Sequence, residues 1–132
     1  MEEGAPLPVR VRPYKATFDL DAAMLRRVRV WAAERGLIGV APVVRALIAE
    51  LGEDGELARA VRAAVAVPAA PPADAVKTTF DLDPPTYRAL KVWAAGHGTT
   101  GTAVLRALLA ALVAGKDGPL ARRIAGLAAT GR

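Results

Sequence analysis

Residues 15–21 read KATFDLD, and residues 77–83 read KTTFDLD. In both stretches apolar side chains alternate with polar ones, a period of two that is typical of a strand with one buried face. A strand this short has two unpaired edges and buries few side chains, so it needs a partner strand. The other such segment in the chain is its near copy. The sequence therefore predicts that the two stretches pair within one chain as an antiparallel ribbon.

The duplication extends well beyond the strands. More than half of the positions in residues 15–36 are identical to those in residues 77–98, and shorter matching blocks follow in both copies. The segment between the copies is rich in proline and alanine, which disfavours a helix and favours an extended connector. The predicted organisation is a flexible N-terminal arm (1–14), a first unit (15–66), a linker (67–76), a second unit (77–129) and a short tail (130–132).

After each strand the apolar period changes to that of a helix. Asp21 and Asp83 stand at N-cap positions, and Gly36 and Gly98 provide left-handed stops at the other end of this first helix. A second helix follows a tight turn, and a third helix is predicted over residues 56–66 and 119–129. The expected fold is mainly α with one short two-stranded antiparallel β-ribbon. Its buried face packs against the first two helices of both copies and carries Phe18, Leu20, Phe80 and Leu82.

The second helices are expected to begin differently in the two copies. Thr100 is a suitable N-cap in the second copy. In the first copy Gly39 takes the cap position, and Pro42 falls in the first turn, where its missing N–H costs little. The first copy therefore lacks a hydroxyl cap.

Composition limits the possible functions. The 132 residues include no cysteine, which excludes disulfides, thiolate zinc sites and cysteine nucleophiles. A formal net charge of +5 favours a polyanionic partner. The sequence contains no phosphate-binding loop, metalloprotease motif or membrane-length apolar run, and its start is acidic and broken by prolines. We expect a cytoplasmic protein that is not an enzyme and needs no metal or cofactor.

The order of strand, capped helix, glycine turn and second helix with Arg-Ala-Leu resembles the ribbon-helix-helix superfamily of DNA-binding proteins, the Arc and MetJ type. These proteins are normally homodimers, so this chain resembles two fused units that form a pseudo-dimer within one chain. The sequence KTTFDLD, followed by LKVWAA at residues 90–95, is similar to sequences of plasmid partition proteins and repressors.

The resemblance implies that the outer face of the ribbon enters the major groove of DNA. Lysines can donate to guanine or to phosphate, and threonines can contact base edges. Aspartate can accept from cytosine N4, or it can instead pair with a lysine across the strands, and both readings stay open. If Thr17 faces Thr79, each lysine lies opposite an aspartate. The predicted base-reading residues are Lys15, Thr17, Asp19, Lys77, Thr79 and Asp81.

The resemblance also implies that the N-termini of the second helices hold flanking phosphates, through backbone N–H groups and the helix dipole. Because the first copy lacks the hydroxyl cap, we expect its helix N-terminus to bind phosphate more weakly. An arm before the first strand adds two arginines that can reach phosphates. The predicted phosphate-binding residues are Thr100, Gly101, Thr102, Gly39, Val40, Arg10 and Arg12.

Other distinctive side chains have structural interpretations. Trp31 and Trp93 recur at core spacing, and His97 suits a surface position at a helix end. Arg45 and Arg106 occupy the same position in both second helices, where they can hold an internal carboxylate or reach a phosphate. A solvated helix face is predicted for Arg26, Arg27, Arg29, Arg88 and Lys91.

The leading prediction is sequence-specific binding of double-stranded DNA, as a transcriptional repressor or as a partition protein of a plasmid or mobile element. A monomeric pseudo-dimer of this kind can also associate side by side on DNA, at a nucleoid or plasmid. A partition protein would contact a motor ATPase, for which the tail around Arg10 and Arg12 is the candidate segment. The alternative is a protein-interaction module, such as an antitoxin whose third helices hold a toxin.

Overall fold

The computed structural model describes residues 14–67 and 74–130, and the structural statements below concern those residues. They form a mainly helical structure with one two-stranded antiparallel sheet and six helices, as the sequence predicts. Arg10, Arg12 and most of the expected linker lie outside the described residues. The elements are β1 (Tyr14–Asp21), α1 (Ala22–Glu34), α2 (Ala41–Leu51), α3 (Glu56–Val65), β2 (Ala75–Leu82), α4 (Pro84–Gly96), α5 (Gly101–Ala114) and α6 (Pro119–Thr130).

The structure decides the register of the ribbon, which the sequence left open. Thr17 lies opposite Thr79, and β1 and β2 run antiparallel through the eight paired positions of each strand. The register places equivalent residues of the two copies at equal distances from this central pair. The ribbon therefore has a pseudo-twofold axis, and both of its strands come from one chain.

The helices that follow the strands begin and end where the sequence predicts. The Asp21 carboxylate accepts a hydrogen bond from the Met24 backbone N–H at 3.1 Å, which caps α1. The Asp83 carboxylate caps α4 in the same way. Gly36 and Gly98 have φ angles of 72° and 66°, a left-handed conformation that glycine adopts without steric cost.

The start of α2 differs from the prediction by one residue. The N-cap is Val40 rather than Gly39, because the Val40 carbonyl accepts the first helical hydrogen bond, from the Val44 N–H at 3.0 Å. Gly39 lies just before it with a φ angle of 78° and turns the chain into the helix. No side chain caps α2, whereas the Thr100 hydroxyl caps α5 as predicted.

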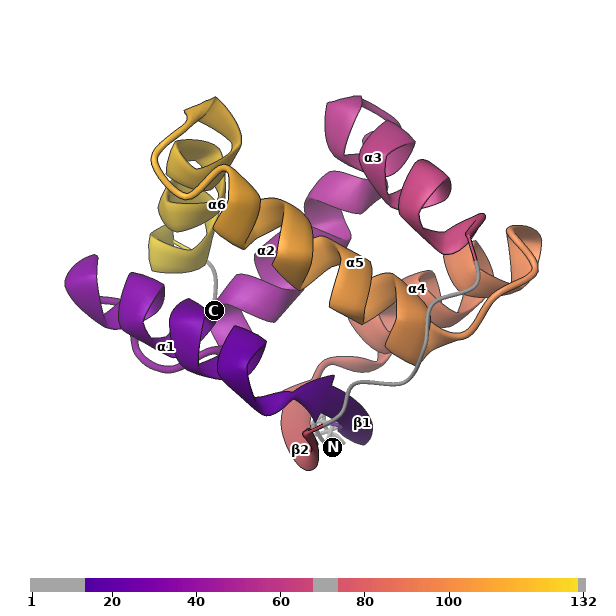
Figure 1. Ribbon diagram of the computed structural model, residues 1–132, viewed down its shortest axis with the longest axis horizontal. Coiled ribbons are helices and arrows are strands. Elements are labelled where there is room, and N and C mark those ends of the chain that lie inside the picture. Colours follow the sequence, from indigo (N-terminus) through magenta and orange to yellow (C-terminus); the bar gives the residue numbers. More distant parts are fainter. Residues whose placement is uncertain (1–13, 68–73, 131–132) are drawn as a thin grey trace, which may run out of the picture.

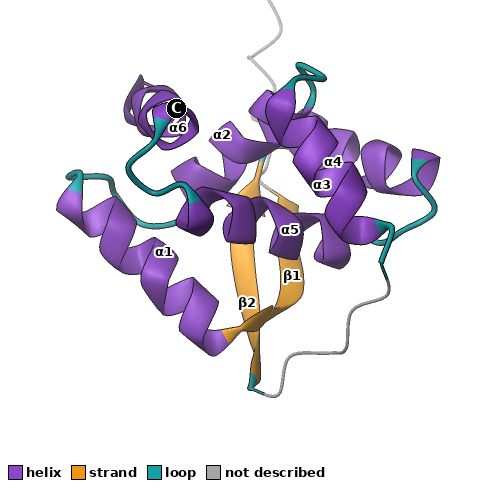
Figure 2. Ribbon diagram, turned by 45° about the horizontal axis from the view of Figure 1, so that its top comes forward, coloured by secondary structure: helices purple, strands orange, loops and turns teal. Residues whose placement is uncertain are grey.

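The ribbon lies along one edge of the molecule, with α1 and α4 on opposite sides of it (Figures 1 and 2). Helices α2 and α5 cover its inner face. The Phe18 and Phe80 rings on that face are 6.2 Å apart and almost fully buried. The predicted apolar face of the ribbon is therefore the floor of the core.

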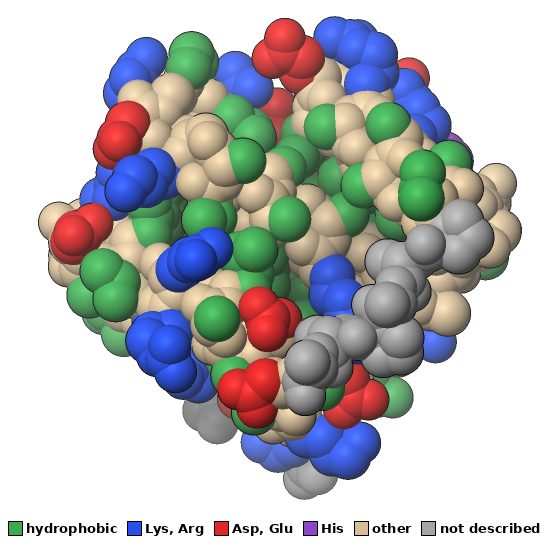
Figure 3. All heavy atoms as spheres, in the orientation of Figure 1, with side chains coloured by type: hydrophobic (Ala, Val, Ile, Leu, Met, Phe, Trp, Pro, Cys, Tyr) green, Lys and Arg blue, Asp and Glu red, His purple; other side chains and the backbone are tan. Residues whose placement is uncertain are grey.

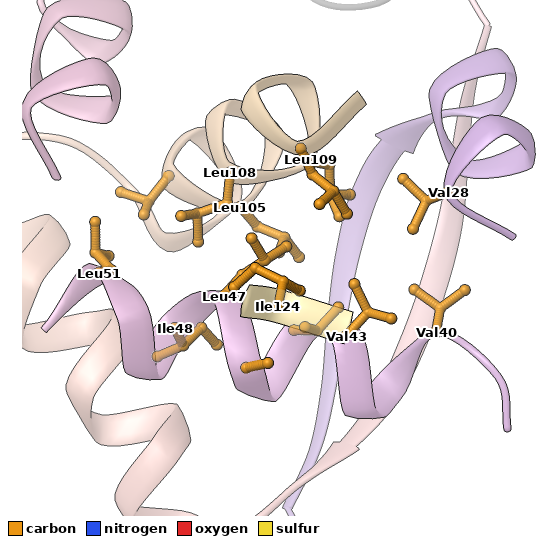
Figure 4. Close-up of a cluster of buried hydrophobic side chains, with 14 of the residues drawn as sticks. Val28, Val40, Val43, Leu47, Ile48, Leu51, Leu105, Leu108, Leu109 and Ile124 are labelled. Carbon is orange, nitrogen blue, oxygen red and sulfur yellow. The ribbon is translucent and has the colours of Figure 1, made fainter. Parts of the chain in front are cut away.

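The third helices cross between the copies. Helix α6 packs on α2, and α3 packs on α5, so each third helix covers the second helix of the other copy. Ile124 of α6 is fully buried and lies close to Leu47 and Ile48 of α2 (Figure 4). An ion pair of 3.1 Å between Arg123 and Glu50 joins the same two helices. The two copies consequently share one core.

The two tryptophans both contact the core, as predicted, but to different extents, since Trp93 only packs against its edge. Trp31 is 3% exposed, and its Nε1 donates to the Lys116 carbonyl at 3.0 Å. Trp93 is only partly buried and stacks on His97, with ring centroids 3.8 Å apart. Trp31 therefore contacts the turn between α5 and α6 of the other copy, whereas Trp93 stacks on the end of its own helix.

None of the described helices is by itself long and apolar enough to cross a membrane. Helices α4 and α5 together have the necessary length and composition, but the chain bends by 101° between them.

The N-cap of α4 predicts an acid-dependent contribution to stability. Burial opposes ionisation of Asp83, but hydrogen bonds from the Thr86 hydroxyl and backbone N–H outweigh it, so the pKa lies below its ordinary value of 3.8. Ionised Asp83 therefore stabilises the folded protein at pH values above the pKa of the unfolded state. This stabilisation is lost as the pH falls through the pKa of the folded state.

Asp83→Asn keeps a capping oxygen but removes the charge at the helix N-terminus. We expect it to lower the free energy of unfolding at pH 6 by a few tenths to about 1 kcal/mol. The difference in the free energy of unfolding between variant and wild type should disappear as the pH falls below about 4. Urea denaturation at a series of pH values measures it, and a gap that stays constant down to pH 2 would contradict the assignment.

Candidate nucleic-acid interface

Six polar side chains form the outer face of the ribbon, hereafter the ribbon face. Successive residues of a strand point to opposite sides, so burial of the apolar set turns the polar set outward. All six residues are exposed. They are the predicted base-reading residues Lys15, Thr17 and Asp19 of β1 and Lys77, Thr79 and Asp81 of β2.

Each lysine of the ribbon face forms an ion pair with an aspartate of the other strand. The distance from Nζ to Oδ1 is 3.3 Å in both the Lys15–Asp81 and the Lys77–Asp19 pair. Between them, the hydroxyl oxygens of Thr17 and Thr79 lie 2.8 Å apart and share a hydrogen bond. Cross-strand pairing, one of the two readings left open for the aspartates, is therefore present. Because the charges are exposed, each pair adds only about 0.2–1 kcal/mol to stability.

The ribbon face carries no net charge, because its two lysines and two aspartates balance. Basic and acidic side chains are intermixed along the lower edge of the molecule in Figure 3, where Figure 1 places the ribbon. The excess positive charge of the chain therefore belongs to other segments. A net electrostatic attraction for a polyanion must therefore come from residues outside the ribbon face.

Arg45 and Arg106 make a contact that neither predicted alternative included. Nη1 of Arg45 in α2 donates to the Asp81 backbone carbonyl of β2 at 3.3 Å. Nε of Arg106 in α5 donates to the Asp19 carbonyl of β1 at 2.9 Å. Each second helix thus holds the strand of the other copy. These bonds fix the ribbon relative to the N-termini of α2 and α5.

The N-terminus of α5 is capped and accessible. The Thr100 hydroxyl oxygen accepts from the Ala103 N–H at 3.1 Å, which leaves its own O–H free to donate. Thr100 is exposed, while Gly101 and Thr102 are partly buried. A side-chain Cβ at Gly101 would lie 4.0 Å from the Lys91 side chain, so a lysine runs beside this helix end.

The N-terminus of α2 adjoins the ribbon. Gly39, Val40, Arg29 and Thr79 line a hollow of about 340 Å³, so the helix start, a cation and the ribbon face share one concave surface. Val40 is only 8% exposed as a whole residue, and its side chain belongs to the core. Of the predicted phosphate-binding groups at this end, Val40 can therefore contribute only its backbone.

Arg29 and Lys91 are the site residues that sequence reasoning missed. They were predicted to lie on solvated helix faces, and both are exposed, but each also lies beside the N-terminus of the second helix in its own copy. Lys91 is held there over the Tyr87 ring, with Nζ 5.5 Å from the ring centroid. The signal that could have found them is that they are equivalent positions of the two copies and both are cations.

Within residues 14–67 and 74–130, no cluster of three or more His, Cys, Asp or Glu side chains is arranged to hold a metal ion. Comparisons of the chain with protein-family models, curated proteins and solved structures gave no match.

Proposed function

We propose that the chain binds double-stranded DNA in a sequence-specific manner, as a tandem ribbon-helix-helix protein whose two copies form a pseudo-dimer. The observation that supports this most directly is the ribbon face. It is fully polar, symmetric about Thr17 and Thr79, and flanked by helix N-termini that each lie beside a cation.

The dimensions suit a major groove. Two paired strands lie about 4.8 Å apart, and the groove is about 12 Å wide and admits a two-stranded ribbon. With the ribbon in the groove, the N-termini of α2 and α5 would face the phosphates on either side, where N–H groups and the helix dipole favour anions. Arg29 and Lys91 would add a positive charge at each contact.

The proposed DNA core is short and nearly palindromic, because equivalent side chains meet equivalent base edges on either side of the pseudo-twofold axis. The flanking contacts are unequal, since Thr100 offers a hydroxyl on one side and Val40 only its backbone on the other. Both a repressor and a partition protein can use such a site. Several cores in tandem would favour partition.

Salt-dependent binding tests the proposal. Fluorescence anisotropy with a random duplex at 50 and 200 mM salt should show micromolar or weaker binding that falls steeply with salt. Duplexes selected from a randomised pool should bind much more tightly at the higher salt. Failure to bind any duplex at 50 mM salt by a folded, monodisperse sample would refute DNA binding and favour the protein-interaction alternative.

Substitutions of Thr100 separate capping from phosphate contact. Thr100→Ala should destabilise the protein by about 1 kcal/mol through loss of the cap, and it should weaken DNA binding several-fold. Thr100→Asp preserves a capping oxygen but faces phosphate with a negative charge, so we expect near-normal stability with a larger loss of affinity. Thr100→Ser is the matched control and should retain both the stability and the DNA affinity of the wild type. Equal DNA affinity for the serine and aspartate variants would show that this helix end does not touch DNA.

A further inference from the structure

The two ion pairs on the ribbon face place a hydrogen-bond donor and an acceptor side by side. In each pair the lysine Nζ lies 3.3 Å from an aspartate Oδ1. The side chains are 77% and 57% exposed in one pair and 78% and 51% exposed in the other, so a ligand can reach both atoms of a pair. An ammonium has three N–H groups and a carboxylate has several lone pairs, so each group keeps capacity for a further partner.

A G·C base pair presents the complementary arrangement in the major groove. Guanine offers O6 and N7 as acceptors, and cytosine offers an N4–H donor. Watson–Crick pairing holds O6 and N4 about 2.9 Å apart, close to the spacing within the ion pair. Building on the proposed DNA binding, we infer that each Lys–Asp pair reads one G·C base pair as a unit. The lysine donates to guanine O6 and N7, and the aspartate accepts from cytosine N4.

The other base pairs fit less well. A T·A pair in the same orientation also offers an acceptor and a donor, thymine O4 and adenine N6. However, a thymine methyl then replaces guanine N7 beside the lysine, and the acceptor N7 of adenine faces the carboxylate. In the C·G and A·T orientations a base N–H donor meets the ammonium. Only guanine on the lysine side offers the ammonium two acceptors and places no base acceptor opposite the carboxylate.

The register of the ribbon predicts the spacing of the two recognised G·C base pairs in the DNA. The ion pairs lie two residues to either side of the Thr17–Thr79 pair. Four residues span about 14 Å of strand, which corresponds to at most about four base-pair steps of 3.4 Å. The pseudo-twofold axis places the two guanines on opposite strands. The core should therefore hold two inverted G·C pairs with about two or three base pairs between them.

The aspartates then improve discrimination at the expense of affinity, since a carboxylate near phosphates is repelled. Asp19→Ala/Asp81→Ala should bind random duplex more tightly than the wild type. It should also lose most of the preference for G·C over T·A at the two positions, which we expect to be about 10- to 100-fold in the wild type. The matched control is Glu53→Ala/Glu56→Ala, which removes the same charge from exposed positions near the start of α3, away from the ribbon (Figure 1). The control should retain the preference.

The experiment selects duplexes from a randomised pool with the wild-type protein. It then measures anisotropy for single G·C to T·A changes with all three proteins, after circular dichroism has shown them to be folded. Two inverted G·C base pairs in the selected core, together with loss of discrimination only in the aspartate variant, support the inference that each Lys–Asp pair recognises one G·C pair. A selected core without the two inverted G·C pairs overturns this inference while DNA binding stands. An aspartate variant that still prefers G·C over T·A does the same. A wild type that binds no duplex even at 50 mM salt refutes the proposed function itself, and the reading with it.

Discussion

Lys15→Ala/Lys77→Ala is expected to weaken binding to the selected duplex by at least about 30-fold, since each base contact of this type contributes about 1–3 kcal/mol. The loss has two sources. Two donors disappear from the ribbon face, and Asp19 and Asp81 lose the ammonium groups 3.3 Å away that neutralise them. The face changes from no net charge to two negative charges. The salt dependence, as the slope of log K against log salt, should flatten by about one to two units.

The measurement is a salt titration of DNA affinity by anisotropy. Arg59→Ala/Lys116→Ala provides the control, because it removes two exposed positive charges that are not on the ribbon. It should reduce affinity only a few-fold, through the general field of the protein. Circular dichroism must show native helix content in both variants. If the doubly substituted lysine variant is folded and binds as tightly as the wild type, the ribbon face is not the DNA-binding surface.

Ile124→Ala is expected to lower the free energy of unfolding by about 2–5 kcal/mol. Ile124 has no exposed surface and packs where α6 meets α2 of the other copy (Figure 4). Truncating it leaves a cavity between the two copies, in the middle of their shared core. The loss should therefore affect the whole molecule rather than the end of the chain alone.

Urea denaturation followed by the fluorescence of the two tryptophans and by far-ultraviolet circular dichroism measures this effect. Both probes should report one transition with a lowered midpoint. Leu127→Ala on the same helix is the matched control, since Leu127 is 41% exposed and its truncation should cost less than about 1 kcal/mol. Separate transitions for the two probes, or equal effects of the two substitutions, would show that α6 is not part of the shared core.

The sequence predicted the antiparallel ribbon because alternation is a local pattern, but it left the register open, and the structure shows what selects that register. A slip of one residue would turn Phe18 and Phe80 outward, and only one register also places each lysine opposite an aspartate. The helix starts follow from side chains within one turn of the cap, as at Asp21 and Asp83. The start of α2 was wrong by one residue because it has no side-chain cap to mark it.

The candidate site was predictable in part. Strand alternation identified all six residues of the ribbon face, but whether the aspartates pair across the strands depended on side-chain geometry. Arg29 and Lys91 were assigned to solvated faces, since a helical pattern shows that a residue is exposed but not which neighbouring element it lies beside.

The sequence by itself determined which segments form strands and helices, which face of each is buried, and that the duplicated strands pair antiparallel. Only the tertiary structure decided that α3 and α6 cross to the other copy, that Arg45 and Arg106 hold the opposite strands, and that Trp31 and Trp93 differ. The physical reason is that hydrophobic burial is non-directional. An apolar stripe specifies that a face must be covered, whereas the covering element is selected by packing between segments far apart in the chain.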